Sequence, residues 1–233
     1  MIEQNLQSVR DRISAACLAA GRISSEVKLL AVSKKFSAAA VLEALGGGQL
    51  AFGENYITEG ASKIVELHHY PALEWHCIGP VQSNKTRLVA EHFDWVQSVD
   101  RLKIAQRLSE QRPLHLQPLQ ICLQVNIDGG INKSGVAPDE LMTLVQEVIK
   151  LPRLRLRGLM MIPEPAINFE AAYALYSRAR AIFDQVNDQI NRSIGLAEPM
   201  DTLSIGMTAD LEAAIAAGST MVRVGTAIFG ERQ

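Results

Sequence analysis

Two hydrophobic patterns alternate along the chain. Short apolar runs rich in branched residues, typical of buried strands, are separated by longer stretches in which apolar residues recur every three or four positions, as in amphipathic helices. The first helical pattern covers residues 3–20 and precedes the first strand. The expected strands cover residues 29–34, 50–52, 74–78, 93–99, 119–126, 155–162, 202–204 and 221–224.

A helical pattern follows each of the first seven strands, without a long linker or a break in composition. Such alternation predicts parallel strands joined by right-handed crossovers, and eight units favour closure into a barrel. The expected fold class is therefore α/β, a single (β/α)8 TIM-type barrel with an additional N-terminal helix, forming one domain over residues 1–233. An open doubly wound sheet is the alternative, but no GxGxxG motif follows the first strand.

Composition and charge narrow the functional classes. The chain has 48% hydrophobic and 21% charged residues, as globular proteins do, and its net charge of −2 gives no overall attraction for nucleic acid or anionic lipid. No apolar run is long enough to span a bilayer, and the three cysteines and five histidines lack metal-binding spacing. We expect a cytoplasmic monomer that binds neither nucleic acid nor membrane and holds no metal.

Lys34 lies at the end of the first expected strand. Lysine side chains are rarely buried without a partner, and the C-terminal ends of barrel strands form the face that carries active sites. At such a position, desolvation or a nearby cation lowers the pKa of an ammonium group and frees an amine to attack a carbonyl carbon. The alternative is that Lys34, or its neighbour Lys35, is a solvated charge at a strand end.

Other polar residues and glycines also gather at strand ends, and in a barrel these ends would converge on one face. Their repeated placement is harder to attribute to chance than a single case would be. The groups are Lys34, Gly53–Asn55, His76 with Gly79, Asn126, Met160–Pro163, Ser204–Thr208 and Arg223–Thr226.

The last two groups match the usual phosphate site of barrels, at the loops after strands seven and eight. Glycines allow a close backbone approach, and peptide N–H groups, hydroxyls and the start of a following helix stabilise an anion. For either loop alone, a helix cap and a tight turn explain the residues at least as well. The candidate phosphate contacts are Ser204, Gly206, Met207, Thr208, Gly225 and Thr226.

A phosphate site opposite a reactive lysine suggests a phosphorylated carbonyl compound. Pyridoxal 5′-phosphate fits, because its aldehyde can form a Schiff base with Lys34 while its phosphate occupies the opposite loops. Arg223 lies beside the phosphate loop and could reach the pyridine nitrogen. A phosphate clamp or an ion pair inside the barrel would explain Arg223 equally well.

Several motifs, in their order and spacing, resemble the YggS-like pyridoxal-phosphate homeostasis proteins over nearly the whole chain. The resemblance implies the barrel of the N-terminal domain of alanine racemases, Lys34 as the internal aldimine lysine, phosphate contacts from 204–208 and 225–226, and Arg223 facing the pyridine nitrogen. The motifs are Ala-Val-Ser-Lys (31–34), Phe-Gly-Glu-Asn-Tyr (52–56), Glu-Trp-His-Cys-Ile-Gly-Pro-Val-Gln-Ser-Asn-Lys (74–85), Lys-Ser-Gly (133–135), Arg-Gly-Leu-Met (157–160), Leu-Ser-Ile-Gly-Met-Thr-Ala-Asp (203–210) and Val-Arg-Val-Gly-Thr-Ala-Ile-Phe-Gly (222–230).

Five neighbouring residues each have two interpretations. Asn55 could contact the cofactor or form a turn, and Met160 could pack near the ring or in the core. His76 is expected to be a hydrogen-bonded barrel residue, with catalysis as the alternative. Lys133 fits a solvated loop position better than a second aldehyde site. Asp210 is expected to help a helix start rather than bind metal.

The resemblance implies a regulator or carrier of pyridoxal phosphate rather than an efficient catalyst, with delivery to apoenzymes as a further role. An arginine can only donate, so Arg223 opposite the ring nitrogen would weaken the electron sink. We also expect no counterpart of the β domain that supplies a tyrosine in alanine racemases, since the sequence runs to Gln233. A low-activity amino-acid racemase and a lysine-dependent aldolase are the alternatives.

Overall fold

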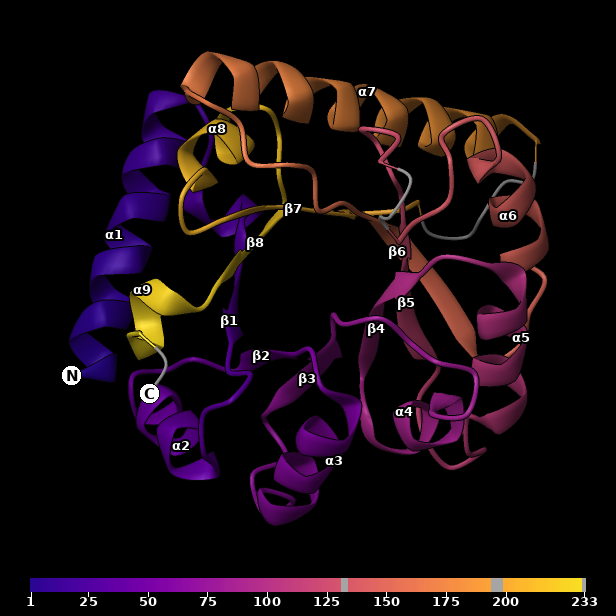
Figure 1. The fold of residues 1–233 in the computed structure, drawn as a ribbon, viewed down its shortest axis with the longest axis horizontal. Coiled ribbons are helices and arrows are strands. Elements are labelled where there is room, and N and C mark those ends of the chain that lie inside the picture. Colours follow the sequence, from indigo (N-terminus) through magenta and orange to yellow (C-terminus); the bar gives the residue numbers. More distant parts are fainter. Residues whose placement is uncertain (131–133, 194–198, 232–233) are drawn as a thin grey trace.

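The computed structural model describes residues 1–130, 134–193 and 199–231 (Figure 1). Eight strands form a closed barrel in which neighbours in sequence are neighbours in space, all pairs are parallel, and β8 pairs with β1. The strands are β1 (Lys28–Val32), β2 (Ala51–Glu54), β3 (Glu74–Cys77), β4 (Trp95–Val99), β5 (Leu119–Gln124), β6 (Leu154–Met160), β7 (Thr202–Met207) and β8 (Met221–Val224).

A ring of helices surrounds the barrel (Figure 1). The helices are α1 (Ile2–Ala19), α2 (Ala38–Gly46), α3 (Ile57–Glu66), α4 (Thr86–His92), α5 (Leu102–Gln111), α6 (Leu141–Val148), α7 (Phe169–Ser193), α8 (Leu211–Ala216) and α9 (Thr226–Phe229), with a 3₁₀ turn at Ser24–Glu26. The predicted fold class is confirmed, and all eight expected strands are present.

The first helix has a specific place in this ring. In a (β/α)8 barrel each strand is followed by a helix, but within residues 199–231 the helix that follows β8 is the four-residue α9. Helix α1 packs against α2, α8 and α9 and so covers the strands β1 and β8 where the eighth outer helix would lie (Figure 1). The sequence predicted α1 but not its position. It did not reveal α9 or the 3₁₀ turn, because elements of three or four residues show no periodicity.

Apolar side chains form an outer core and two smaller clusters inside the barrel. The outer core joins the helices to the outward faces of the strands and includes Leu6, Phe52 and Leu159. Strand residues alternate between the two sides: Ala31 belongs to the outer core, whereas its neighbours Leu30 and Val32 do not. The interior clusters are Leu30, Val32, Ala51, Ile78 and Met221 on one side and Trp95, Cys122 and Met160 on the other.

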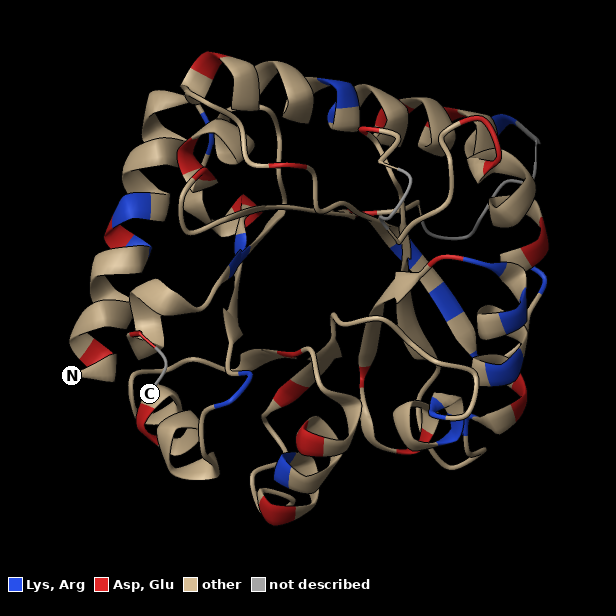
Figure 2. Ribbon diagram, in the orientation of Figure 1, with Lys and Arg blue, Asp and Glu red and all other residues tan. Residues whose placement is uncertain are grey.

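Charged residues of both signs are distributed around the helical ring (Figure 2). Among the helices that the structure describes, none combines the length and apolarity needed to cross a bilayer. Within the same residues, His, Cys, Asp and Glu side chains do not come together in a group that could hold a metal ion.

We predict that helix α1 contributes to stability through its buried face. Leu6 is fully buried, whereas Leu18 on the same helix is 80% exposed. Leu6→Ala is expected to lower the free energy of unfolding by about 2–4 kcal/mol, because it removes buried methyl groups and leaves a cavity. Leu18→Ala is expected to change it by less than about 0.5 kcal/mol. Urea titration followed by circular dichroism measures both, and equal effects would contradict the placement of α1.

Candidate functional site

A pocket of about 420 Å³, which we call the upper pocket, opens at the C-terminal end of the strands. Its wall brings together seven of the ten residues predicted from sequence as a cofactor site: Lys34, Asn55, Met207, Thr208, Arg223, Gly225 and Thr226. The rest of the wall is largely apolar and consists of Val32, Phe36, Ile78, Ile162, Ala209 and Gly230. The combination of an apolar wall with a few convergent polar groups is typical of a small-molecule site.

The other three predicted residues do not line the pocket. Met160, the last residue of β6, is fully buried against Trp95 and Cys122. Ser204 is buried in β7 and hydrogen-bonds Arg223. Gly206 has a φ of +92°, and a Cβ there would lie 2.4 Å from the Cβ of Ala214 in α8. Ser204 therefore contacts the pocket residue Arg223, and Gly206 allows β7 to approach α8 closely.

Lys34 lies in a turn just after β1, and helix α3 fixes this turn. Lys35 has a φ of +66°, a left-handed conformation that is unfavourable for a residue with a side chain. Its backbone N–H donates to Oε1 of Glu59 in α3 at 2.6 Å. The backbone oxygen of Ser33 accepts from the N–H of Phe36 at 3.0 Å, which closes the turn. Lys34 is thus held between two anchored residues.

Lys63 of α3 also holds this turn, through the backbone oxygen of Ser33. Its side chain is almost completely buried, and Nζ donates to Oε1 of Glu54 at 2.6 Å and to the backbone oxygen of Ser33 at 2.8 Å. Nζ also lies 2.9 Å from Oε1 of Glu59, so each ammonium hydrogen has an acceptor. Burial raises the pKa of Glu54, and the cation of Lys63 together with the hydroxyl of Ser33 opposes this rise.

Asn55 follows β2 and presents an unsatisfied acceptor. Its side-chain Oδ1 is buried without a hydrogen-bond partner among the described residues. The backbone there is fixed by the loop after β3, since a Cβ on Gly79 would lie 2.0 Å from the carbonyl oxygen of Asn55. Buried polar atoms in proteins nearly always have a partner, so this oxygen marks a position where a ligand would donate a hydrogen bond.

The loop after β7 is ordered by Asp210, which directly precedes α8. Asp210 accepts from the backbone N–H of Met207 at 2.7 Å through Oδ1 and from the hydroxyl of Tyr176 at 2.7 Å through Oδ2. Burial and this carboxylate raise the pKa of Tyr176. Asp210 occupies the position just before α8, as expected, but its carboxylate orders the preceding loop and makes no capping hydrogen bond to that helix. Its side chain also fixes Met207, which lines the pocket beside Thr208.

Arg223 provides the positive charge of the pocket. It is 4% exposed, and its NH1 donates to both the backbone oxygen and the hydroxyl of Ser204 at 2.7 Å. NH2 donates to the backbone oxygen of Met161 at 2.9 Å. Burial lowers the pKa of the guanidinium, but arginine stays protonated in proteins. The pocket therefore contains a fixed cation.

Sequence reasoning missed the apolar wall and the clamp on the turn. Phe36 lines the pocket and stacks on Phe229 with ring centroids 5.0 Å apart, yet in sequence it is one aromatic residue in a loop. Lys63 falls on the buried face of an amphipathic helix, which was a possible signal that this lysine has a buried partner. Lys133 lies outside the described residues, so the structure does not test its expected role.

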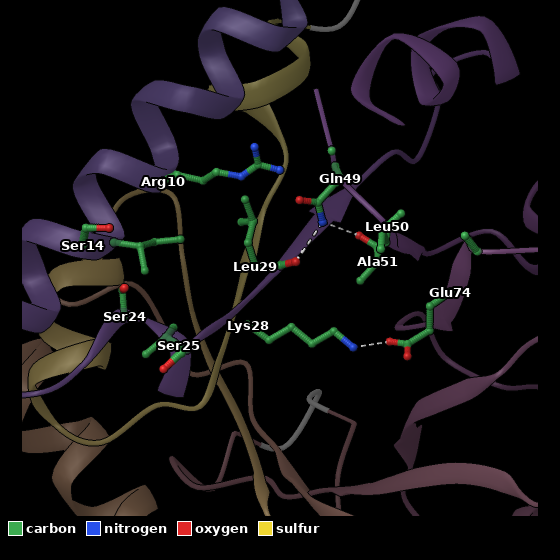
Figure 3. Close-up of a pocket in the computed structure, with 14 residues that line it drawn as sticks. Arg10, Ser14, Ser24, Ser25, Lys28, Leu29, Gln49, Leu50, Ala51 and Glu74 are labelled. Carbon is green, nitrogen blue, oxygen red and sulfur yellow. Dashed lines mark hydrogen bonds and ion pairs between the residues drawn. The ribbon is translucent and has the colours of Figure 1, made fainter. Parts of the chain in front are cut away.

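A second pocket, of about 570 Å³, lies at the opposite end of the barrel, beside the first residues of β1, β2 and β3 (Figure 3). We call it the lower pocket, and it contains none of the predicted site residues. An ion pair between Lys28 and Glu74 closes one side of it (Figure 3). Burial acts to raise the pKa of Glu74, but hydrogen bonds and charge from His76 and Lys28 outweigh this and lower it to about 2.

The fold and the upper pocket define a (β/α)8-barrel protein with a lysine just after its first strand, and with a buried arginine and two threonines at and after its last two strands. The family model for the N-terminal domain of alanine racemase matches residues 2–233. The chain is 55% identical to a pyridoxal phosphate homeostasis protein of Pseudomonas aeruginosa, covering 99% of this chain and 96% of that protein. It is 50% identical to one of Escherichia coli, covering 99% and 97%. The chain belongs to this family of pyridoxal phosphate homeostasis proteins.

Solved structures agree with this assignment. PipY of Synechococcus elongatus, determined with PLP bound, is 35% identical, with a TM-score of 0.84 over 99% of this chain and 100% of that chain. An alanine racemase of Clostridium difficile is 16% identical, with a TM-score of 0.71 over 99% of this chain and 56% of that chain. The second likeness shows a shared fold.

We predict that removing the Lys63 cation destabilises the protein, since it leaves the carboxylate of Glu54 buried and unpaired. Lys63→Met is expected to lower the free energy of unfolding by about 3–5 kcal/mol. Adding Glu54→Gln should recover part of this loss. Lys103→Met, on the exposed face of α5, is the control and should change stability by less than about 0.5 kcal/mol. Denaturant titration measures all four proteins, and a Lys63→Met variant as stable as the control would contradict the clamp.

We also predict an acid-dependent contribution from Glu74. Because its pKa is lowered from 4.5 to about 2, its ionised form stabilises the fold above pH 4.5, and this stability is lost as the pH falls toward 2. Glu74→Gln should therefore flatten the dependence of the unfolding free energy on pH across that interval. Glu66→Gln, on the exposed side of α3, should retain the wild-type slope. Identical slopes in both variants would contradict the prediction.

Proposed function

We propose that the chain binds pyridoxal 5′-phosphate in the upper pocket, holds it reversibly on Lys34 and serves in the homeostasis of this cofactor. The observation that carries the proposal is the pocket wall, on which a lysine amine, a buried arginine and a loop with hydroxyl and N–H donors converge. Family membership supports it, because the curated relatives are pyridoxal phosphate homeostasis proteins and PipY was solved with PLP bound.

The donor set fits the three polar parts of this molecule. The phosphate needs hydrogen-bond donors, which Thr208 and Thr226 provide through their hydroxyls and Gly225 through its backbone. The ring hydroxyl is a donor, and the buried Oδ1 of Asn55 is an acceptor without a partner among the described residues. Arg223 can donate to the ring nitrogen.

The aldehyde accounts for the role of Lys34. When the molecule is bound, its aldehyde carbon accepts an amine nitrogen, water leaves, and a carbon–nitrogen double bond forms that hydrolysis reverses. Lys34 provides the nitrogen, and the anchored turn limits where Nζ can reach. Phe36, Ile78 and Ile162 add apolar surface to the pocket wall. Reversible attachment suits a protein that withholds a reactive aldehyde and later releases it to apoenzymes.

The arginine supports a binding role over a catalytic one. A guanidinium can only donate a hydrogen bond, so Arg223 facing the ring nitrogen keeps that nitrogen unprotonated and limits electron withdrawal by the ring. We propose that the chain acts as one binding domain over residues 1–233, with the ring-nitrogen contact favouring retention of the cofactor over turnover.

Borohydride trapping tests the proposal. Purified protein is incubated with pyridoxal phosphate, reduced with borohydride, digested and mapped by mass spectrometry. We expect one dominant reduced adduct, on Lys34, and its complete loss in Lys34→Ala. Lys35→Ala is the matched control, since it removes the adjacent lysine outside the pocket wall, and it should retain the adduct. A folded wild-type protein without an adduct on Lys34 would refute the proposal.

Release to apoenzymes is tested separately. Loaded protein is mixed with the apo form of a pyridoxal-phosphate-dependent enzyme, and recovery of that enzyme's activity is compared with recovery from the same amount of free pyridoxal phosphate. Recovery that follows loss of the Lys34 adduct supports delivery. A loaded protein that never reactivates the apoenzyme while keeping its adduct would restrict the role to storage.

A further inference from the structure

A chain of hydrogen-bonded side chains crosses the interior of the barrel from Arg223 in the upper pocket to Glu74 at the lower one. The intermediate members are Ser204 in β7, Gln97 in β4 and His76 in β3, and all three are buried. Strands β4 and β7 are not neighbours in the barrel, so the contact between Gln97 and Ser204 crosses its interior.

The contacts are short and continuous. Arg223 NH1 lies 2.7 Å from Ser204 Oγ, and Ser204 Oγ lies 2.7 Å from Gln97 Oε1. Gln97 Nε2 lies 2.9 Å from His76 Nδ1, and His76 Nε2 lies 2.5 Å from Glu74 Oε1. Glu74 also pairs with Lys28 at the mouth of the lower pocket (Figure 3).

The chemistry of the two end groups, Arg223 and Glu74, fixes the direction in which every hydrogen bond of this side-chain network donates. The guanidinium at one end can only donate, and the carboxylate at the other can only accept. Glu74 therefore requires a hydrogen on Nε2 of His76, which leaves Nδ1 of the neutral ring as an acceptor. Nδ1 then takes a hydrogen from the amide of Gln97, and Oε1 of Gln97 takes the hydrogen of the Ser204 hydroxyl.

This polarity matters for Arg223 because a serine hydroxyl rotates freely unless its hydrogen is engaged. With its hydrogen on Gln97, Ser204 Oγ turns a lone pair toward NH1 of Arg223. The backbone oxygen of Met161, the residue after β6, accepts from NH2. The plane of the guanidinium is therefore set by the backbone oxygens of Ser204 and Met161 and by one oriented hydroxyl.

We propose that Gln97, His76 and Glu74 are positioning residues that hold the guanidinium of Arg223 toward the ligand pocket. The inference rests on the proposed function, in which Arg223 faces the bound pyridoxal phosphate. It assigns a role in ligand binding to Glu74, a residue that lies at the opposite end of the barrel.

Three variants test this network of hydrogen-bonded side chains. Gln97→Leu removes its central link, and Glu74→Leu removes the acceptor that sets its polarity. Lys28→Leu is the matched control, because it removes the other half of the same ion pair and leaves the contact between Glu74 and His76 in place. Glu74 and Lys28 are partly exposed at the mouth of the lower pocket, so both variants are expected to fold even if Gln97→Leu does not.

The readouts are the dissociation constant for pyridoxal phosphate and the absorption maximum of the bound molecule, which reports the environment of its ring. Gln97 orients the Ser204 hydroxyl that accepts from the charged Arg223, and hydrogen bonds to charged groups are among the stronger ones, so Gln97→Leu should weaken binding roughly tenfold. It should also shift the absorption maximum. Glu74→Leu should shift the maximum in the same direction and weaken binding about threefold, as a more distant link would. Lys28→Leu should match the wild type in both readouts, and thermal melts confirm that each variant is folded.

Two results would overturn the inference, and they are distinguishable. If the wild type fails to bind pyridoxal phosphate or to form the Lys34 adduct, the proposed function fails and this inference fails with it. If the wild type binds but Glu74→Leu and Lys28→Leu are indistinguishable, the inference alone fails. A shift in Glu74→Leu that is absent from Lys28→Leu supports it.

Discussion

The burial of Arg223 is the constraint on which much of this structure depends. A guanidinium that is 4% exposed loses most of its hydration, and the protein must replace that water with acceptors. The barrel provides them from the backbone oxygen of Met161, just after β6, and from Ser204 on β7, and Ser204 in turn needs Gln97. One buried cation therefore explains why polar side chains occupy the middle of the barrel while apolar clusters fill the two sides.

The same reasoning applies at the other end of the pocket, where the turn that carries Lys34 would be costly on its own. Lys35 has a left-handed backbone, and such conformations persist only where neighbouring groups hold them. Glu59 holds the N–H of Lys35, and Lys63 holds the carbonyl of Ser33, so α3 is matched to the loop of a different βα unit. The pocket is thus built on buried charges whose partners come from neighbouring elements.

The sequence was informative where local patterns suffice. Eight apolar runs separated by helical periodicity predicted the barrel, and Lys34, Arg223 and the two glycine-containing loops were found because such residues are unusual at the ends of buried strands. The partners of these residues were not predictable in the same way. Gln97 lies within β4, where nothing in the local sequence marks it, and its contact with Ser204 links positions 107 residues apart. Met160 shows a different limit. Its place at a strand end suggested a contact with a ligand, but its side chain packs in the interior cluster with Trp95 and Cys122.

The closure of the barrel has a consequence for how the protein is made. Strand β1 pairs with β8, helix α1 packs against α9, and Asn5 donates to the backbone oxygen of Ile228 at 2.9 Å. A ribosome releases the first helix and strand long before the last, so β1 keeps one open edge until β8 has been synthesised. The pocket is divided in the same way, with Lys34 made early and Arg223 and Thr226 made late. A nascent chain therefore lacks the complete pocket, and Lys34 meets the loops after β7 and β8 only when the two ends of the chain come together.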